Sequence, residues 1–223
     1  MCDRGVNEAD HECGNKGLVR IGLTGGIGSG KSEVARILES LGAYIVDTDD
    51  LARQAVAPGS DALREVARVW PSVVRDESLD RAALAQIVFR DPSARERLNA
   101  IVHPHVRRLA GEADRYAQSG QVIVHVVPLL FETGYVDRVD ASIVVIAPED
   151  ERIRRVVMRD RLSEEQVRSR MASQIDPETA RRLATYVIEN DGNLVHLRER
   201  TRAVYEALTS RQVGGETAAK STT

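Results

Sequence analysis

Cysteine is scarce in this sequence of 223 residues, and both cysteines, Cys2 and Cys13, lie in a polar N-terminal stretch. The remaining sequence therefore offers neither a disulfide framework nor a thiolate metal site, which suits a reducing, cytoplasmic setting. Aromatic residues make up only 4% of the chain, and 34 acidic residues outnumber 31 basic ones. With little aromatic surface for base stacking and no surplus of positive charge for a phosphate backbone, we expect no nucleic-acid partner.

Long apolar runs are also missing. The longest uncharged run, residues 121–131, falls far short of the roughly 20 residues that span a bilayer. The first eight residues contain no apolar stretch typical of a signal peptide. We therefore expect no membrane association, while the 42% of hydrophobic residues is enough for a folded core.

Short apolar runs alternate with helical patterns along the middle of the chain. This alternation is typical of a parallel sheet with right-handed helical crossovers. The runs that predict strands are residues 18–24, 43–46, 121–127, 141–147 and 186–188. We therefore expect an α/β fold with a three-layer α/β/α core and a mostly parallel five-stranded sheet.

Two stretches between these strands have helical patterns and predict additions to the core. Residues 50–120 contain no predicted strand and form a helical insertion, in which His103-Pro104 is expected to break a helix that begins at Asp91-Pro92. Residues 159–182 predict a flap of short helices that closes over a ligand. The predicted units are a flexible leader 1–17, one domain 18–211 with core segments 18–49, 121–158 and 183–211, and a flexible tail 212–223.

The strongest functional pattern follows the first predicted strand. Residues 25–32 read Gly-Gly-Ile-Gly-Ser-Gly-Lys-Ser and fit the phosphate-binding P-loop, or Walker A, pattern at every fixed position. Glycines allow backbone N–H groups to converge on phosphate oxygens, and the helix that follows directs its positive end at the anion. In such a loop Lys31 reaches the β- and γ-phosphates, and the Ser32 hydroxyl helps to coordinate Mg²⁺. A dinucleotide fingerprint is excluded because Lys31 stands three residues after Gly28, where that pattern needs glycine.

Missing motifs narrow the class of P-loop protein. No glycine has an aspartate three residues before it, and the only Asn-Lys pair precedes the loop, so the pattern of a switch GTPase is absent. The chain is too short for a large motor ATPase. The best class is a small-molecule kinase that uses ATP and Mg²⁺ and binds its acceptor at the helical insertion. A kinase for a nucleotide or another small molecule, and a non-catalytic ATP-binding regulator, remain as alternatives.

Two groups of charged residues are candidates for the chemistry. Asp47 and Asp49 end the second strand, and their spacing of two would direct both carboxylates to one side of an extended chain. A carboxylate there can accept the proton of the acceptor hydroxyl, although Asp49 also suits the N-cap of a helix over residues 50–56. Five arginines at positions 152, 154, 155, 159 and 161 can neutralise the charge of a transferring phosphoryl group. We expect at most two of them to be catalytic, and the others to form surface ion pairs.

The sequence as a whole resembles the dephospho-CoA kinase family over roughly residues 18–208. The most particular segments are His103-Pro104 and Val127-Pro-Leu-Leu-Phe-Glu132, which accompany the P-loop in the family's order. Other matching segments are residues 46–49, 52–53, 56–60, 79–84, 159–160, 170–174 and 187–190. The resemblance implies a helical CoA-binding subdomain at 50–120, a lid at 159–182, and ATP-dependent phosphorylation of the ribose 3′-hydroxyl of dephospho-CoA.

The resemblance also implies roles for individual residues. Asp49 would be the catalytic aspartate, assisted by Lys31 and by a lid-side arginine at Arg155, with Arg154 as the alternative. Nucleotide contacts would come from Gly28, Ser29, Gly30, Lys31, Ser32, Glu33 and Asn190, the last near the adenine. Acceptor contacts would come from Thr24, His103, Pro128, Leu129 and Leu130, and Arg159 would belong to the lid. Glu33 and Glu189 depart from the family pattern, which typically has threonine and aspartate there, and the oligomeric state is not readable from the sequence.

Overall fold

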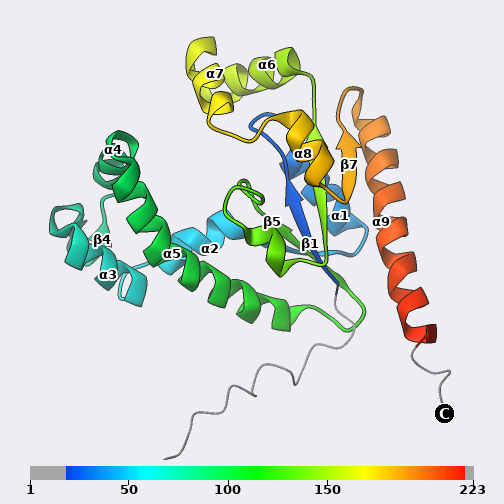
Figure 1. Cartoon of the computed structure of the whole chain (residues 1–223), viewed down its shortest axis with the longest axis horizontal. Helices are drawn as coiled ribbons and strands as arrows, with labels where there is room; N and C mark the ends of the chain where they lie inside the picture. The colour runs from blue at the N-terminus through cyan, green and yellow to red at the C-terminus, as the bar shows by residue number, and fades with distance from the viewer. Residues whose placement is uncertain (1–18, 219–223) are drawn as a thin grey trace, which may run out of the picture.

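The computed structural model describes residues 19–218, and its centre is a sheet of five parallel strands (Figure 1). In spatial order the strands are β2 (Tyr44–Asp47), β5 (Val122–Val126), β1 (Val19–Thr24), β6 (Ala141–Ile146) and β7 (Tyr186–Glu189). All five predicted strands are present, and their parallel pairing brings every carboxyl end to one edge of the sheet. The predicted α/β fold is confirmed.

The two faces of the sheet are covered by different parts of the chain. On β1, Ile21 and Leu23 face a core shared with helices α1 (Lys31–Ser40) and α9 (Leu194–Ala218). Because side chains alternate along a strand, Gly22 faces the other way. A Cβ at Gly22 would lie 2.8 Å from Leu130, so the segment of residues 127–139 packs directly on that second face.

Most of the predicted helical insertion is helical in the structure. It contains α2 (Thr48–Ala55), α3 (Asp61–Val69), α4 (Arg81–Arg90) and α5 (Pro92–Ala113), and the 3₁₀ turn η2 (Asp114–Tyr116) follows. These helices lie to one side of the sheet (Figure 1). A small core of Val66, Val73 and Leu84 gives α3 and α4 a common buried centre.

Two expectations for this region were wrong. A short antiparallel hairpin joins β3 (Val74–Arg75) to β4 (Ser78–Leu79), where no strand was expected. Its turn residues, Asp76 and Glu77, both have positive φ, a conformation that sequence usually signals with glycine or asparagine.

The helix α5 also continues through Pro104 instead of ending at His103-Pro104. Proline removes one helical hydrogen bond and crowds the preceding turn, which costs about 3 kcal/mol in a helix interior. Apolar residues pack on both sides of it, however, with the partly buried Leu98 and Ile101 before the proline and the buried Val106 and Ala110 after it. This packing holds the two halves in one helix of 22 residues.

Three helices follow β6, of which the first precedes the predicted lid at 159–182 and the other two coincide with it. They are α6 (Glu149–Asp160), α7 (Glu164–Ala172) and α8 (Pro177–Leu183). Ser163 and Gln166 form the expected capping box at the start of α7, and Asp176 caps α8. Ile27 of the P-loop packs against the core of α6 and α7, so these helices contact the loop directly.

The chain ends extend beyond the described residues. The predicted leader 1–17 lies outside them, and α9 reaches Ala218, past residue 212 where the tail was predicted to begin. Within residues 19–218, none of the helices combines the length and the apolar character needed to cross a membrane.

Candidate active site

The P-loop connects β1 to α1 at the carboxyl edge of the sheet. Gly28 and Gly30 have φ of 77° and 97°, which L-amino acids with a side chain rarely adopt. Asn190, at the end of β7, donates from Nδ2 to the carbonyl of Ser29 at 2.8 Å and would collide with any Cβ at Gly30. Asn190 is buried and fixes the shape of the loop.

The second strand delivers its two aspartates in a way the sequence did not predict. The strand ends at Asp47, whose carboxylate accepts the backbone N–H of Asp49 at 2.8 Å and caps α2. Asp49 therefore lies in the first turn of the helix, so the prediction of two carboxylates along an extended strand, and of Asp49 as a helix cap, was wrong. Thr48 anchors this turn by donating its hydroxyl to the carbonyl of Val126 at 2.9 Å.

Lys31 and the two aspartates interact electrostatically. Burial lowers the pKa of Lys31, and the charges of Asp49 and Asp47 oppose that shift. The Asp49 side chain reaches solvent, but neighbouring protein atoms displace part of its hydration and raise its pKa above 3.8; Lys31 opposes this shift and Asp47 adds to it. The site therefore holds a lysine and a carboxyl group whose charged forms are both disfavoured by partial desolvation.

A pocket of about 240 Å³ lies beside Asp49, between α2, α5 and the segment that follows β5. The structure brings four predicted residues together in its wall, Asp49, His103, Pro128 and Leu129. Burial, followed by the nearby charge of Arg107, lowers the pKa of His103, so its imidazole is predominantly neutral at pH 7. Most of the other lining residues are apolar.

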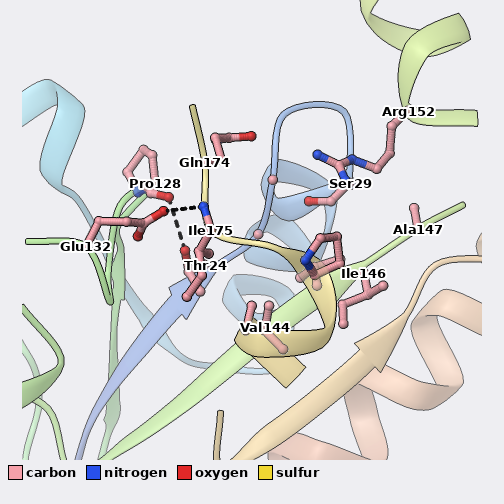
Figure 2. Close-up of a pocket in the computed structure, with 15 residues that line it drawn as sticks. Thr24, Ser29, Pro128, Glu132, Val144, Ile146, Ala147, Arg152, Gln174 and Ile175 are labelled. Carbon is pink, nitrogen blue, oxygen red and sulfur yellow. Dashed lines mark hydrogen bonds between the residues drawn. The ribbon is translucent and has the colours of Figure 1, made fainter. Parts of the chain in front are cut away.

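Leu130 and Thr24 lie elsewhere. Leu130 is fully buried against Gly22 on the sheet and is not among the residues that line this pocket. Thr24 donates its hydroxyl to the carbonyl of Pro128 at 3.2 Å, as Figure 2 shows, and so fixes the wall segment instead. Thr24 lines a separate cavity of about 20 Å³ beside the P-loop.

Two residues of the segment that follows β6 are hydrogen-bonded to the P-loop. Gln174 accepts the backbone N–H of Ile27 at 2.8 Å, and Arg152 donates from Nε to the Ile27 carbonyl at 3.0 Å. Glu132 accepts the N–H of Ile175 at 3.0 Å, a contact drawn in Figure 2. Residues 174–175 thus bridge the P-loop and the segment that forms one wall of the pocket beside Asp49.

Arg154 and Arg155 both pair with Glu151, but only Arg155 also contacts the P-loop. Arg155 directs a guanidinium nitrogen to the carbonyl of Gly28 at 3.4 Å, so it lies against the P-loop. Arg154 is exposed and pairs with Glu151 at 2.7 Å. Arg159 pairs with its neighbour Asp160 at 2.7 Å.

One predicted nucleotide contact has another partner in the structure. Glu33 pairs with Arg36 on α1 at 3.0 Å.

Sequence reasoning missed several residues that the fold brings here. Arg107 lines the acceptor pocket one helical turn after His103, and the periodicity of α5 reveals it once the helix is continued through Pro104. Arg152 was one of five arginines with no local signal to distinguish it. Gln174 and Tyr135 come from distant segments, and no spacing in the sequence connects either to the site.

The loop has the features that a nucleotide requires. Within residues 19–218, the hydroxyl of Ser29 is buried without a hydrogen-bond partner, an arrangement that a phosphate oxygen can satisfy. Oxygen ligands of the kind that Mg²⁺ prefers are available from Ser32, Asp47 and Asp49. The described residues contain no group of three or more His, Cys, Asp or Glu that could hold a metal ion unaided.

Known proteins are similar to this chain in sequence and in fold. The family model described as dephospho-CoA kinase matches residues 19–196. The chain belongs to the dephospho-CoA kinase family. A dephospho-CoA kinase from Moorella thermoacetica is 50% identical over 194 residues, which cover 84% of this chain and 91% of that protein. One from Corynebacterium jeikeium is 44% identical and covers 86% of this chain and 100% of the relative.

Solved structures share the fold of this chain. A protein from Thermus thermophilus has a TM-score of 0.79 at 41% identity, covering 86% of this chain and 98% of that one. A dephospho-CoA kinase from Campylobacter jejuni has a TM-score of 0.65 over the same shares, and at 24% identity it supports the fold alone. The resemblance predicted from the sequence and the assignment to a kinase are confirmed.

Proposed function

We propose that this chain transfers the γ-phosphoryl group of ATP to the ribose 3′-hydroxyl of dephospho-CoA, which gives CoA and ADP in the final step of coenzyme A biosynthesis. Membership of the dephospho-CoA kinase family supports this acceptor. The observation that carries the proposal is the position of Asp49, which interacts with Lys31 of the P-loop and also lines the neighbouring pocket.

In the proposed reaction the acceptor oxygen attacks the γ-phosphorus as the bond to the β-phosphate oxygen breaks. Asp49 accepts the hydroxyl proton, and its raised pKa makes it a stronger base than an ordinary carboxylate. Lys31 and Arg155 stabilise the negative charge on the transferring group, and ADP leaves with the electrons of the broken bond. Mg²⁺, when bound by Ser32 and the nucleotide phosphates, neutralises further phosphate charge.

The acceptor pocket has features that suit dephospho-CoA. This molecule combines a diphosphate with a long uncharged arm that carries methyl and methylene groups between its amides, so its site needs both a cation and some apolar surface. Among the described residues that line the pocket, Arg107 alone carries a permanent positive charge, and it makes no ion pair with a described carboxylate. We assign Arg107 to the diphosphate, with His103, Pro128 and Leu129 as further contacts.

Remaining nucleotide contacts are part of the same proposal. Gly28, Ser29, Gly30 and Ser32 would contact phosphates, and Thr24 and Leu130 would support the acceptor wall from behind. Asn190 would act near the adenine chiefly by holding the loop. Roles for Glu33 and Arg159 in binding, and a cytoplasmic setting, stay predictions.

A panel of acceptors tests the assignment. The purified chain is incubated with Mg-ATP and either dephospho-CoA, adenosine, AMP or a hexose, and both ADP and the phosphorylated product are measured. We expect dephospho-CoA to have the highest kcat/KM by at least about tenfold, with CoA formed in equal amount to ADP. Faster turnover of another acceptor would identify a different small-molecule kinase. Tight ATP binding without turnover of any acceptor would indicate a regulator.

A further inference from the structure

Four buried or partly buried side chains form a hydrogen-bonded row beneath the acceptor pocket. Arg20 of β1 donates from Nε to Asp114 Oδ2 at 2.7 Å. His125 of β5 meets the other carboxylate oxygen of Asp114 through Nε2 at 2.7 Å. The hydroxyl of Tyr135, in the 3₁₀ turn η3 (Tyr135–Arg138), meets His125 Nδ1 at 2.8 Å. The row joins β1 to three later elements, η2, β5 and η3.

The ionised state of Asp114 fixes the direction of the two hydrogen bonds that it receives. Burial disfavours the charge on Asp114, but hydrogen bonds from His125 and Arg20 outweigh it and keep the pKa of Asp114 below 3.8. An ionised carboxylate only accepts, so His125 carries its proton on Nε2. Its Nδ1 is left to pair with the Tyr135 hydroxyl. Burial raises the pKa of Tyr135 to about 12, so the phenol keeps its proton.

The position of Tyr135 connects this row to the site. Tyr135 is only 6% exposed, and it lines the acceptor pocket together with Asp49, His103 and Arg107. Because the hydroxyl is engaged by His125 on the sheet, the aromatic ring is the part that faces the pocket. His125 pairs in register with Gly22, and it lies on the face of the sheet covered by residues 127–139.

We propose that the row Arg20–Asp114–His125–Tyr135 is a positioning device that holds the Tyr135 ring against the apolar part of the acceptor, so that Tyr135 is a specificity-determining residue. The inference rests on the proposed function. A row that only fastened η2 to the sheet would be complete with Arg20, Asp114 and His125. The fourth member extends it to the pocket wall and restricts a side chain that would otherwise rotate.

The direct test is Tyr135→Phe, which keeps the ring and removes only the hydroxyl. We expect the KM for dephospho-CoA to rise about 3- to 10-fold, the effect of one neutral hydrogen bond, while kcat and the KM for ATP stay within about twofold. The control is Thr201→Val, which removes a buried hydroxyl from α9, far from the pocket in the fold. It should lower thermal stability to a similar extent without changing the KM for the acceptor.

A pair of variants at His125 gives a second readout. His125→Asn places an amide oxygen near the position of Nδ1 and can still accept from Tyr135, whereas His125→Leu cannot. We expect the asparagine variant to retain an acceptor KM closer to that of the wild type. This rescue would not follow if the row served stability alone, because both variants lose the bond to Asp114.

The outcomes separate the two proposals. Wild-type turnover of dephospho-CoA with an unchanged acceptor KM in Tyr135→Phe would overturn the positioning role and leave the proposed function intact. Equal increases in both KM values would also overturn it, since they would indicate general loosening of the fold. Absence of CoA formation by the wild-type chain would contradict the proposed function, and the positioning role with it.

Discussion

Two clusters of polar and charged side chains lie beside the pocket that Asp49 and Tyr135 line. They differ in how completely their members are hydrogen-bonded to one another. At the P-loop, Lys31 interacts with Asp49 and Asp47, but no direct ion pair connects Lys31 to either among the described residues. In the other cluster, Arg20, Asp114, His125 and Tyr135 are connected by three hydrogen bonds of 2.7 to 2.8 Å.

The difference separates residues kept for chemistry from residues kept for structure. Partial burial disfavours the charged forms of both Lys31 and Asp49, and their mutual attraction compensates only part of this electrostatic cost. Hydrogen bonds overcome the same cost at Asp114. An incompletely satisfied cluster is useful in an active site, because a bound nucleotide and acceptor can supply the missing partners. We therefore expect substitutions in the first cluster to affect turnover, and those in the second to affect stability and acceptor binding.

The sharpest test of this division is Asp49→Asn. The amide cannot accept the hydroxyl proton, so we expect kcat to fall by about 10²- to 10⁴-fold while the KM for ATP changes little. Steady-state kinetics with dephospho-CoA measures both constants. A loss of less than about tenfold would remove Asp49 from the role of base and weaken the contrast between the clusters.

The same residue gives the site a defined pH dependence. Because the pKa of Asp49 in the free enzyme is raised above 3.8, the carboxyl group becomes protonated at a higher pH than an ordinary aspartate. The kcat/KM of the wild type should therefore fall as pH falls through that raised value, and the residual activity of Asp49→Asn should lack this limb. If kcat/KM instead fell at the pKa of an ordinary aspartate, the result would contradict the desolvation of Asp49 described above.

The next largest effect is expected from Lys31→Met. Loss of the cation that faces the β- and γ-phosphates should lower turnover on the order of 10²-fold or more. Burial dominates the electrostatics of Lys31 in the free protein, so the apolar side chain should leave the melting temperature unchanged or raise it. Arg36→Met, which removes an exposed cation from the same helix, is the control and should retain turnover. A clear drop in melting temperature for Lys31→Met would place Lys31 with the structural residues.

The two clusters also differ in how well the sequence predicts them. The P-loop is a local pattern whose roles belong mainly to the backbone, so residues 25–32 and the strand and helix around them could be predicted. Asp49 was found for its chemistry, but its conformation was mistaken because Asp47 and Asp49 both suit an N-cap, and nothing local shows that the cap is Asp47. His125 and Tyr135 meet only because β5 lies beside β1 with residues 127–139 folded back on the sheet. Such contacts depend on tertiary packing, and the spacing of these residues along the chain does not predict them.

The second cluster is tested by Asp114→Asn. The substitution removes the charge that Arg20 and His125 share, and we expect the free energy of unfolding at neutral pH to fall by about 1–3 kcal/mol. Wild-type Asp114 has a depressed pKa, so its contribution is present above the unfolded value, near 3.9, and is lost as pH falls through the folded one. The difference between the proteins should therefore shrink in acid. Urea denaturation at several pH values measures it, and a constant difference would contradict the ionised state of Asp114.

The smallest expected effect decides which arginine extends the P-loop cluster. Arg155 contacts the Gly28 carbonyl at 3.4 Å, and it can turn toward a phosphate once the nucleotide supplies a stronger acceptor. Arg154 is exposed, and its contacts are with Glu151. We expect Arg155→Ala to lower kcat by at least about tenfold and Arg154→Ala by less than twofold, with neither changing the melting temperature by more than a few degrees. These two variants form a matched pair on one helix, so equal losses of kcat would assign the effect to α6 as a whole. A larger loss for Arg154→Ala would require α6 to rotate when the nucleotide binds.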